Sequence, residues 1–286
     1  MLIAVSGATG YIGAHVVKAL AERGHEVIAT DFNEEQNNIA HYCKSYYHYD
    51  IRDYGGKFTN VDKTVHIAAK TKVGPSVKDP WNYYNTNING TKNIIYAFNC
   101  DHFIYCSTGS AFQPDSNPYA MSKYAGEVIT KQFYEKNSIV RFYNVSGNDG
   151  MYKFDDEMSH LIRKAARVAN KSNGHPIMEL FGTDYNTRDG TCIRNYTHIK
   201  DIVDGLVRIV EAEPSGKIDC LGSPDGITVK EVIDTMKKVS GIDFPVKIGP
   251  RRPGDIEIST VPHSSPFFKQ TKTLWHMCKD ALEFEK

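Results

Sequence analysis

The chain has 286 residues, 41% of them hydrophobic, and its 34 basic and 34 acidic side chains give a formal net charge of zero. This composition predicts a globular protein of one large or two modest domains, and a sequence without a basic block argues against a nucleic-acid partner. The first apolar run, 2–5, is far shorter than the ~20 residues of a membrane span, and the six cysteines lack the spacing of a metal site. We therefore expect a cytoplasmic protein with reduced cysteines, no membrane association and no bound metal.

The first 24 residues predict a strand, a tight turn and a helix in immediate succession. The apolar strand leads into Gly7, Gly10 and Gly13, and helical spacing of apolar residues continues over Tyr11–Arg23 to Gly24. Gly7 permits the turn, Gly10 lets the backbone approach a pyrophosphate, and Gly13 lets the helix lie against the strand. The backbone N–H groups at the helix N-terminus favour an anion. The alternative is a loop whose glycines serve only helix packing, but their place directly after the first strand favours a dinucleotide site. The dinucleotide would be bound by Gly7, Gly10, Tyr11, Ile12 and Gly13.

The second predicted strand, His25–Thr30, is followed by Asp31. A carboxylate at this position accepts a hydrogen bond from a ribose 2′-hydroxyl and repels a 2′-phosphate, which favours NAD over NADP. The alternative is an ordinary turn residue at the end of a strand.

Two further strands are predicted before the middle of the chain. Tyr46–Tyr49 forms the third, and Asp50 and Ile51 follow it where they can reach the adenine end of a dinucleotide, although a turn-capping Asp50 is an alternative. The fourth, Thr64–Ala69, ends in Ala68 and Ala69, which are small enough for a cofactor to approach the backbone.

The pattern then alternates between helices and strands. A loop over Lys70–Gly74 precedes a long apolar helix, Pro80–Cys100, and a second helix is predicted over Tyr119–Glu135. Strands are predicted at Phe103–Cys106 and Ile139–Tyr143. This alternation predicts an α/β fold with a Rossmann-type doubly wound parallel sheet, which binds ligands at the carboxyl ends of its strands.

The regular alternation of predicted strands and helices ends near residue 150. Longer helices are expected near Glu157–Ala169, His198–Glu213 and Val229–Val239. We predict an NAD-binding domain over 1–150, to which 191–215 returns, and a smaller substrate-binding lobe over 151–286. Arginines in the loops of that lobe suit a substrate with a diphosphate, namely Arg188, Arg194, Arg251 and Arg252.

Three residues of the first domain predict proton-transfer chemistry. Tyr119 and Lys123 are four residues apart near the start of a helix, so the phenol and the ammonium share one helix face. A tyrosine with its ordinary pKa near 10 is a poor base, but a nearby lysine and the positive nicotinamide ring favour the phenolate. Thr108, at a strand end, can bond the same reacting oxygen. The Tyr-x-x-x-Lys spacing also occurs by chance, but together with the glycine turn it predicts removal of an alcohol proton while hydride leaves the carbon.

With these motifs, the chain resembles the extended short-chain dehydrogenase/reductase superfamily and, within it, the UDP-galactose 4-epimerase family. The resemblance rests on segments spread along the whole chain, which are 7–13, 66–90, 119–123, 141–144, 181–185, 189–191, 194–198 and 251–255. It implies an NAD-dependent isomerase of nucleotide-sugar and galactose metabolism, acting on a UDP-hexose through a 4-keto intermediate. It also implies that Thr108, Tyr119 and Lys123 are catalytic. Tyr119 and Lys123 would also contact the cofactor, together with Asn87, Phe142 and Tyr143. The nucleotide sugar would be held by Asn144, Phe181, Arg194, Arg252 and Asp255, together with Thr108 and Tyr119.

The chain departs from the family pattern at four places. Thr71 stands where the family usually has a lysine that contacts the cofactor, and roughly a dozen residues usual between Thr108 and Tyr119 are missing. Glu157 falls near a usual substrate-binding asparagine, and the tail after Asp255 is short. We expect a more open rim around the site.

The residue four positions beyond Asp255 is Ser259. In the resembling epimerases, the residue at this position forms a wall of the sugar pocket. A serine leaves room there, so we expect N-acetylated UDP-hexoses to be substrates as well, unless the short tail shifts the register.

Two rival functions use the same motifs. A nucleotide-sugar 4,6-dehydratase or decarboxylase needs further acid or base groups, but Thr108 is followed by Gly109, Ser110 and Ala111. A non-catalytic NAD-binding protein would not need the Thr, Tyr and Lys set.

A homodimer is also expected. The broad apolar face of 82–100 and the helix after Tyr119 cannot both be covered by one sheet, which predicts a four-helix bundle across a two-fold axis, as the resemblance also implies.

Overall fold

The computed structural model describes residues 1–34, 39–55, 57–152, 160–170, 177–214, 216–252 and 255–284. The chain divides into two compact units, which we call the N-terminal unit (Met1–Phe142 and Val203–Leu221) and the C-terminal unit (Tyr143–Ile202 and Gly222–Lys286). The assignment of one part of the chain to the cofactor and the other to the substrate stays a prediction.

One parallel sheet of seven strands forms the centre of the N-terminal unit. The strands are β1 (Leu2–Ser6), β2 (Glu26–Asp31), β3 (Ser45–His48), β4 (Thr59–His66), β5 (Phe98–Thr108), β6 (Asn137–Phe142) and β11 (Ile218–Cys220). Their order is β11-β6-β5-β4-β1-β2-β3, and all neighbouring pairs run parallel. The chain moves outward from β1 to β3 and then returns to β4 on the other side of β1. The predicted Rossmann-type doubly wound sheet is confirmed, and its switch point lies between β1 and β4, where such folds bind ligands.

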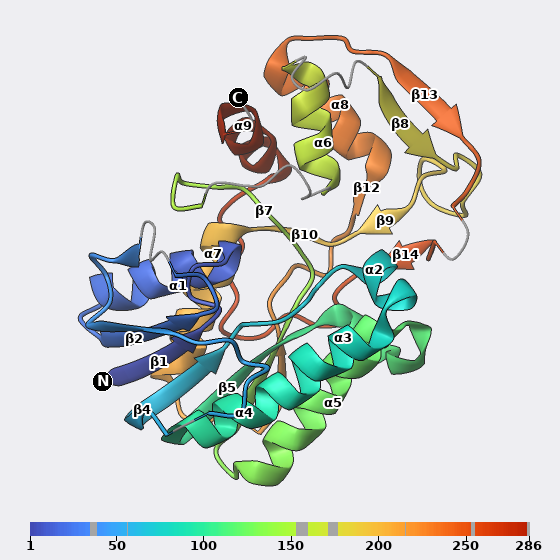
Figure 1. Ribbon diagram of the computed structural model, residues 1–286. Helices are drawn as coiled ribbons and strands as arrows, with labels where there is room; N and C mark the ends of the chain where they lie inside the picture. Colours follow the sequence, from blue (N-terminus) through green and yellow to red (C-terminus); the bar gives the residue numbers. More distant parts are fainter. Residues whose placement is uncertain are drawn as a thin grey trace. The chain divides into compact units, whose positions relative to one another are not determined.

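Helices cover the sheet of the N-terminal unit (Figure 1). Helix α1 (Tyr11–Glu22) lies beside the later part of α7 (Ile199–Glu211), and Arg23 forms 2.8 Å ion pairs with Asp204 and Glu211. A second group of helices packs together farther along the chain, namely α2 (Val73–Lys78), α3 (Pro80–Tyr84), α4 (Gly90–Ala97) and α5 (Pro118–Phe133). Strands β1, β2 and β6 are almost entirely buried, and so are the carboxyl-terminal parts of β4 and β5, as expected of a parallel sheet covered on both faces.

The predicted helix over Pro80–Cys100 is wrong in its continuity and at its end. It consists of α3, a π-helical segment at Asn85–Asn89, and α4, which ends at Ala97. The next three residues alternate between buried and exposed side chains and pair with β4, so the fifth strand starts five residues earlier than predicted. Strand pairing outweighs the helical spacing of the apolar residues here.

Other predicted boundaries are wrong as well. The fourth strand starts at Thr59 rather than Thr64, because its first residues pair with β5, and the sixth starts at Asn137 rather than Ile139. The fourth strand ends at His66 rather than Ala69, because the amides of Ile67 and Ala68 both donate to the Ser6 carbonyl and so leave the ladder. The predicted loop before residue 75 contains the first turn of α2. The strand predicted to end at Tyr143 ends at Phe142.

The C-terminal unit combines small sheets with three helices. Its strands are β7 (Asn144–Ser146) with β10 (Tyr196–His198), β8 (Met178–Phe181) with β13 (Val246–Gly249), and β9 (Ile193–Arg194) between β12 (Ile227–Thr228) and β14 (Ile258–Ser259). Helices α6 (Leu161–Ala169), α8 (Val229–Ser240) and α9 (Leu274–Phe284) share one apolar core (Figure 1).

Sequence patterns predicted two of these helices and missed the third. Helix α8 begins at a capping box between Thr228 and Glu231 and ends before Gly241, whose φ is +69°. Helix α6 lies within its predicted range. Helix α9 was not predicted, and a hydrogen bond of 2.8 Å between Asp280 and the buried His198 of β10 fixes it in the unit.

All six cysteines are free, and five of them are buried. Within the described ranges, no helix is long and apolar enough to span a membrane, and no group of three or more His, Cys, Asp or Glu side chains could hold a metal ion.

Candidate active site

The glycine turn lies between β1 and the N-terminus of α1. Gly7 has a φ of +71°, and a Cβ there would lie 2.7 Å from the backbone nitrogen of Ala68. A Cβ on Gly13 would lie 1.9 Å from the Gly7 carbonyl oxygen, so the helix approaches the turn too closely for any other residue. No side chain caps the helix N-terminus, which begins after Gly10. The turn therefore keeps the backbone bare at the position where a pyrophosphate would lie.

Asp31, at the end of β2, is buried beside this turn. Its carboxylate accepts hydrogen bonds from the amides of Thr9 (3.0 Å) and Phe32 (2.8 Å). Asp31 therefore orders the turn, and a carboxylate has further acceptor positions for a ribose hydroxyl.

We expect Asp31→Asn to narrow the preference for NAD over NADP, because the amide keeps an oxygen for the turn but removes the charge that repels a 2′-phosphate. Dissociation constants for both cofactors, measured by calorimetry on wild type, Asp31→Asn and Asp31→Ala, check this. An unchanged preference in both variants would mean that Asp31 serves the turn alone.

The residues that follow β4 are held by Ser6 of β1 and by Asn87 of the π-helical segment. The Ala68 amide bonds to the Ser6 carbonyl, and Asn87 bonds to both the amide (2.8 Å) and the carbonyl (3.0 Å) of Lys70. The Asn87 amide also donates to Ser122 of α5 at 2.8 Å. Asn87 thus fixes the loop after Ala68 and Ala69. This structural role accounts for an asparagine at position 87 even if its side chain does not contact the cofactor.

Asp50 and Ile51 lie beyond the end of β3. Arg52 binds the Asp50 carboxylate through two nitrogens, and this hydrogen bonding holds the pKa of Asp50 below its ordinary value. Ile51 is buried against Gly90 of α4, where a Cβ would lie 2.6 Å from its Cδ1. Both contacts fit the structural alternative for these residues as well as a cofactor contact.

The end of β5 and the start of α5 bring Thr108 and Tyr119 together. Burial raises the pKa of Tyr119, and a hydrogen bond with the Thr108 side chain lowers it in part. The ring of Tyr83, from α3, packs edge-on against the Tyr119 ring at 6.4 Å between centroids. In the protein without cofactor the phenol is protonated, so it becomes a base only when positive charge is brought close.

Lys123 lies one turn further along α5 and is 3% exposed. Burial lowers the pKa of its ammonium to about 8. The ammonium is therefore still charged at neutral pH, but the margin is small. This places a buried, readily titrated cation on the helix face that carries Tyr119.

A buried ion pair behind these residues was not predicted. Glu127, two turns after Tyr119, binds Arg141 of β6 through bonds of 2.8 and 2.7 Å, and both side chains are 3% exposed. The Ser107 hydroxyl donates to the same carboxylate at 2.5 Å. Removal of one partner from such a pair costs about 3–5 kcal/mol. The pair ties together the three elements that carry Thr108, Tyr119 and Phe142, and the i, i+4, i+8 spacing of Tyr119, Lys123 and Glu127 was the signal that could have revealed it.

In the C-terminal unit, the structure brings the predicted substrate residues into one cluster. Asp255 binds Arg252 at 2.8 Å and lies 3.7 Å from Arg194. The Arg252 guanidinium lies 5.3 Å from the ring centroid of Phe181. Two guanidinium groups share one carboxylate, which leaves net positive charge for a diphosphate.

Asn144 and Ser259 flank this cluster. The Asn144 side chain donates to the carbonyl of Asn195, the residue after Arg194, at 2.9 Å. Ser259 is paired with Arg194 in the parallel ladder between β14 and β9. The short tail therefore still places Ser259 beside a predicted substrate residue.

Of two departures from the family pattern, the structure describes one, the short connection between Thr108 and Tyr119. Glu157 lies outside the described residues. The short connection between Thr108 and Tyr119 forms two turns of 3-10 helix, Gly109–Phe112 and Pro114–Ser116.

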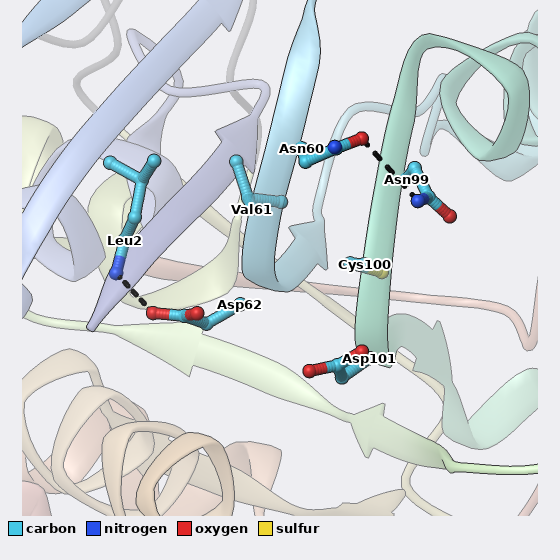
Figure 2. A pocket seen from close by; sticks show the side chains of 7 residues that line it. All are labelled: Leu2, Asn60, Val61, Asp62, Asn99, Cys100 and Asp101. Carbon is cyan, nitrogen blue, oxygen red and sulfur yellow. Dashed lines mark hydrogen bonds between the residues drawn. The ribbon is translucent and has the colours of Figure 1, made fainter.

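One surface hollow lies at the amino edge of the seven-stranded sheet, opposite the carboxyl edge that carries Thr108. It is lined at the amino ends of β1, β4 and β5 by Leu2, Asn60, Val61, Asp62, Asn99, Cys100 and Asp101. Figure 2 shows that Asp62 bonds to the Leu2 amide (2.7 Å) and that Asn99 bonds to Asn60 (3.3 Å). Ligands of doubly wound sheets bind at the carboxyl edge, so this hollow is not part of the candidate site.

Comparison with known proteins gives a consistent match. Residues 3–220 match the model of the NAD dependent epimerase/dehydratase family. The UDP-glucose 4-epimerase of Halalkalibacterium halodurans is 32% identical, and the alignment covers 89% of this chain and 85% of that protein.

Solved structures match along nearly the whole length. The UDP-Glc/GlcNAc 4-epimerase of Campylobacter jejuni is 29% identical with a TM-score of 0.81, and 99% of this chain and 98% of that chain are covered. The UDP-glucose 4-epimerase of Bifidobacterium longum, solved with NAD⁺ and UDP, has a TM-score of 0.86 at 24% identity, with 100% and 98% covered, and supports the fold.

Proposed function

Because the chain belongs to the NAD dependent epimerase/dehydratase family, we propose that it interconverts UDP-galactose and UDP-glucose with bound NAD, through a transient 4-keto sugar. The observation that carries the proposal is the placement of Thr108, Tyr119 and Lys123 at β5 and α5 of a doubly wound sheet that begins with a bare glycine turn. The UDP-glucose 4-epimerases among the relatives support this choice of substrate.

The glycine turn fits NAD. A Cβ at Gly7 would clash with the backbone of Ala68 and one at Gly13 with the Gly7 carbonyl, so glycine is required for the tight turn that brings the bare helix N-terminus against β1, and the Asp31 carboxylate ends the next strand. We propose that Gly7, Gly10 and Gly13 line the pyrophosphate, with Tyr11 and Ile12 at the helix N-terminus, and that Asp31 binds the adenosine ribose. The chemistry that NAD supplies when bound is the reversible acceptance of the C4 hydride.

Tyr119 is proposed as the base that takes the proton of the C4 hydroxyl. The phenolate is favoured when the Lys123 ammonium and a positive nicotinamide are both close, because the pKa of the buried phenol is otherwise raised. Thr108, whose side chain is close enough to the phenol to lower its pKa in part, is placed to bond to the same sugar oxygen. When the hydride returns to the opposite face of C4, Tyr119 gives the proton back, and the cycle needs no further acid or base.

We assign substrate binding to the cluster of the C-terminal unit. Arg194 and Arg252 supply positive charge for the diphosphate, Asp255 and Asn144 supply polar contacts, and Phe181 supplies an apolar face. The ring contact of Arg252 orients its guanidinium before any ligand binds.

The rival functions lack support from the same residues. Gly109, Ser110 and Ala111, which follow Thr108, form a 3-10 turn without a titratable side chain. A 4,6-dehydratase or decarboxylase needs an acid or base for its second step, and this segment supplies none.

A chromatographic assay of UDP-galactose with the purified protein, without added oxidant, tests the proposal. The expected product is UDP-glucose at the same total nucleotide sugar. A dehydrated 4-keto-6-deoxy product, carbon dioxide from a UDP-uronic acid, or no conversion of any UDP-sugar would each overturn the assignment.

We also propose that the protein forms a two-fold dimer through α3, α4 and α5. Large apolar side chains remain exposed on these helices, namely Trp81 (78%), Tyr96 (47%), Tyr124 (40%), Val128 (38%) and Phe133 (53%). Contiguous exposed apolar side chains on paired helices are typical of a helical-bundle interface.

Light scattering at micromolar concentration should give twice the chain mass. Tyr124→Glu combined with Val128→Glu should give monomers, because two charges would be buried at the interface. Ile248→Glu, at an apolar residue of β13 that is 63% exposed, is the control and should stay dimeric. A monomeric wild type would contradict the proposal.

The small side chain of Ser259, beside Arg194, suggests a second substrate pair, UDP-N-acetylgalactosamine and UDP-N-acetylglucosamine. The related Campylobacter jejuni protein is described as a UDP-Glc/GlcNAc 4-epimerase, which supports this extension. The six free cysteines fit a reducing compartment, and we assign the enzyme to the cytoplasm.

A further inference from the structure

The ammonium of Lys123 lies against the ring of Tyr105, a residue of β5 outside the recognised motif. Lys123 Nζ is 4.3 Å from the centroid of this ring. Tyr105 is fully buried and Lys123 is 3% exposed. The face of an aromatic ring attracts a cation, and the attraction grows when both groups are removed from water.

Gly126 of α5 makes this contact possible. A Cβ on Gly126 would lie 2.1 Å from the Tyr105 hydroxyl oxygen and 2.5 Å from its Cζ. Glycine inside a helix lowers helix stability relative to alanine, so its presence there needs a reason. The close approach of the Tyr105 ring to α5 supplies that reason.

The other titratable groups that face Lys123 leave its charge largely uncompensated. From β4, His66 is neutral because burial and the lysine hold its pKa well below the ordinary value. From β5, Cys106 is a neutral thiol because burial raises its pKa to about 12. From α5, the Glu127 carboxyl group already accepts hydrogen bonds from Arg141 on both of its oxygens.

We propose that Tyr105 is a positioning residue that holds the Lys123 ammonium, in its charged form, on the helix face that carries Tyr119. The inference rests on the proposed function, because the charge matters for catalysis only if Tyr119 acts as a base. Burial opposes this charge, and the ring face favours it. Loss of the ring therefore lowers the pH at which Lys123 loses its proton.

Three variants separate this role from packing. Tyr105→Leu removes the ring, and Tyr105→Phe keeps the ring but removes the hydroxyl. Phe103→Leu is the packing control: it removes another fully buried ring of the same strand, one that stacks on Tyr134. Tyr105→Met, which fills more of the space, replaces the leucine variant if that variant does not fold.

Two readouts are taken on each cofactor-loaded protein. The first is kcat for UDP-galactose against pH, with KM. The second is the titration of Lys123 by NMR of protein labelled with ¹³C at the lysine ε-carbon, with Lys123→Arg used to assign the signal.

Tyr105→Leu should move both the alkaline limb and the Lys123 titration down by about one pH unit, and should therefore lower kcat about twofold at pH 7 and about fivefold at pH 8 with KM within twofold. Tyr105→Phe should keep the wild-type profile, and Phe103→Leu should lose thermal stability without moving either titration. An unmoved Lys123 titration in Tyr105→Leu, or an equal movement in Phe103→Leu, would overturn the inference. If wild type does not epimerise UDP-galactose, the proposed function fails, while the NMR titration still decides the role of the ring.

Discussion

Tyr119→Phe should lower turnover of UDP-galactose by at least about 100-fold. The substitution removes the one oxygen of the α5 face that can take the C4 hydroxyl proton, and general-base groups typically contribute 10²–10⁴-fold. NAD binding should change little, because the proposed cofactor contacts lie mainly on the glycine turn and Asp31. The loss should appear in kcat and kcat/KM together, as expected for an interaction made in the transition state.

Tyr83→Phe is the matched control for this experiment. Its ring packs edge-on against Tyr119, so the variant also removes a phenol hydroxyl from the same neighbourhood. We expect it to keep activity within a few-fold. Nearly full activity in Tyr119→Phe, with the purity checked by mass spectrometry, would contradict the mechanism.

Ser259→Tyr should abolish turnover of the N-acetylated UDP-hexoses and leave turnover of UDP-galactose largely intact. Ser259 is paired with Arg194 on the neighbouring strand, so a ring at this position would fill the space that we assign to the acetamido group. A filled pocket rejects the larger substrate by steric overlap, which is a stronger effect than loss of a favourable contact.

Ile258→Tyr is the control, because successive residues of a strand point to opposite sides and Ile258 is 50% exposed. Specificity constants for the four UDP-sugars decide the outcome. If wild type already prefers the plain sugars by more than about 100-fold, another group occupies the acetamido space, and the assignment of Ser259 is wrong.

The sequence predicted the parts of the fold that depend on short-range rules. The glycine turn, the carboxylate at the end of β2 and the spacing of Tyr119 and Lys123 are local patterns, and the structure places each on the expected strand or helix end. The capping box of α8 belongs to the same class.

The rest depends on contacts between distant residues. Phe98 starts β5 because it pairs with β4, although its spacing continues the helical pattern of α4. The pair between Glu127 and Arg141, and the approach of Tyr105 to Gly126, join elements that only the sheet order brings together. These contacts surround the proposed catalytic residues. The identity of the catalytic residues was therefore easier to predict than the contacts that position them.

Isotope retention tests the central claim most directly. UDP-galactose with deuterium at C4 is incubated in ordinary water with the purified protein and its bound NAD, and the UDP-glucose formed is analysed by NMR. The account predicts that deuterium remains at C4 with inverted configuration and that no solvent hydrogen enters C5, because the hydride leaves and returns at one carbon while Tyr119 exchanges only the hydroxyl proton. Loss of deuterium to the solvent, or exchange at C5, would contradict it and would indicate an elimination route.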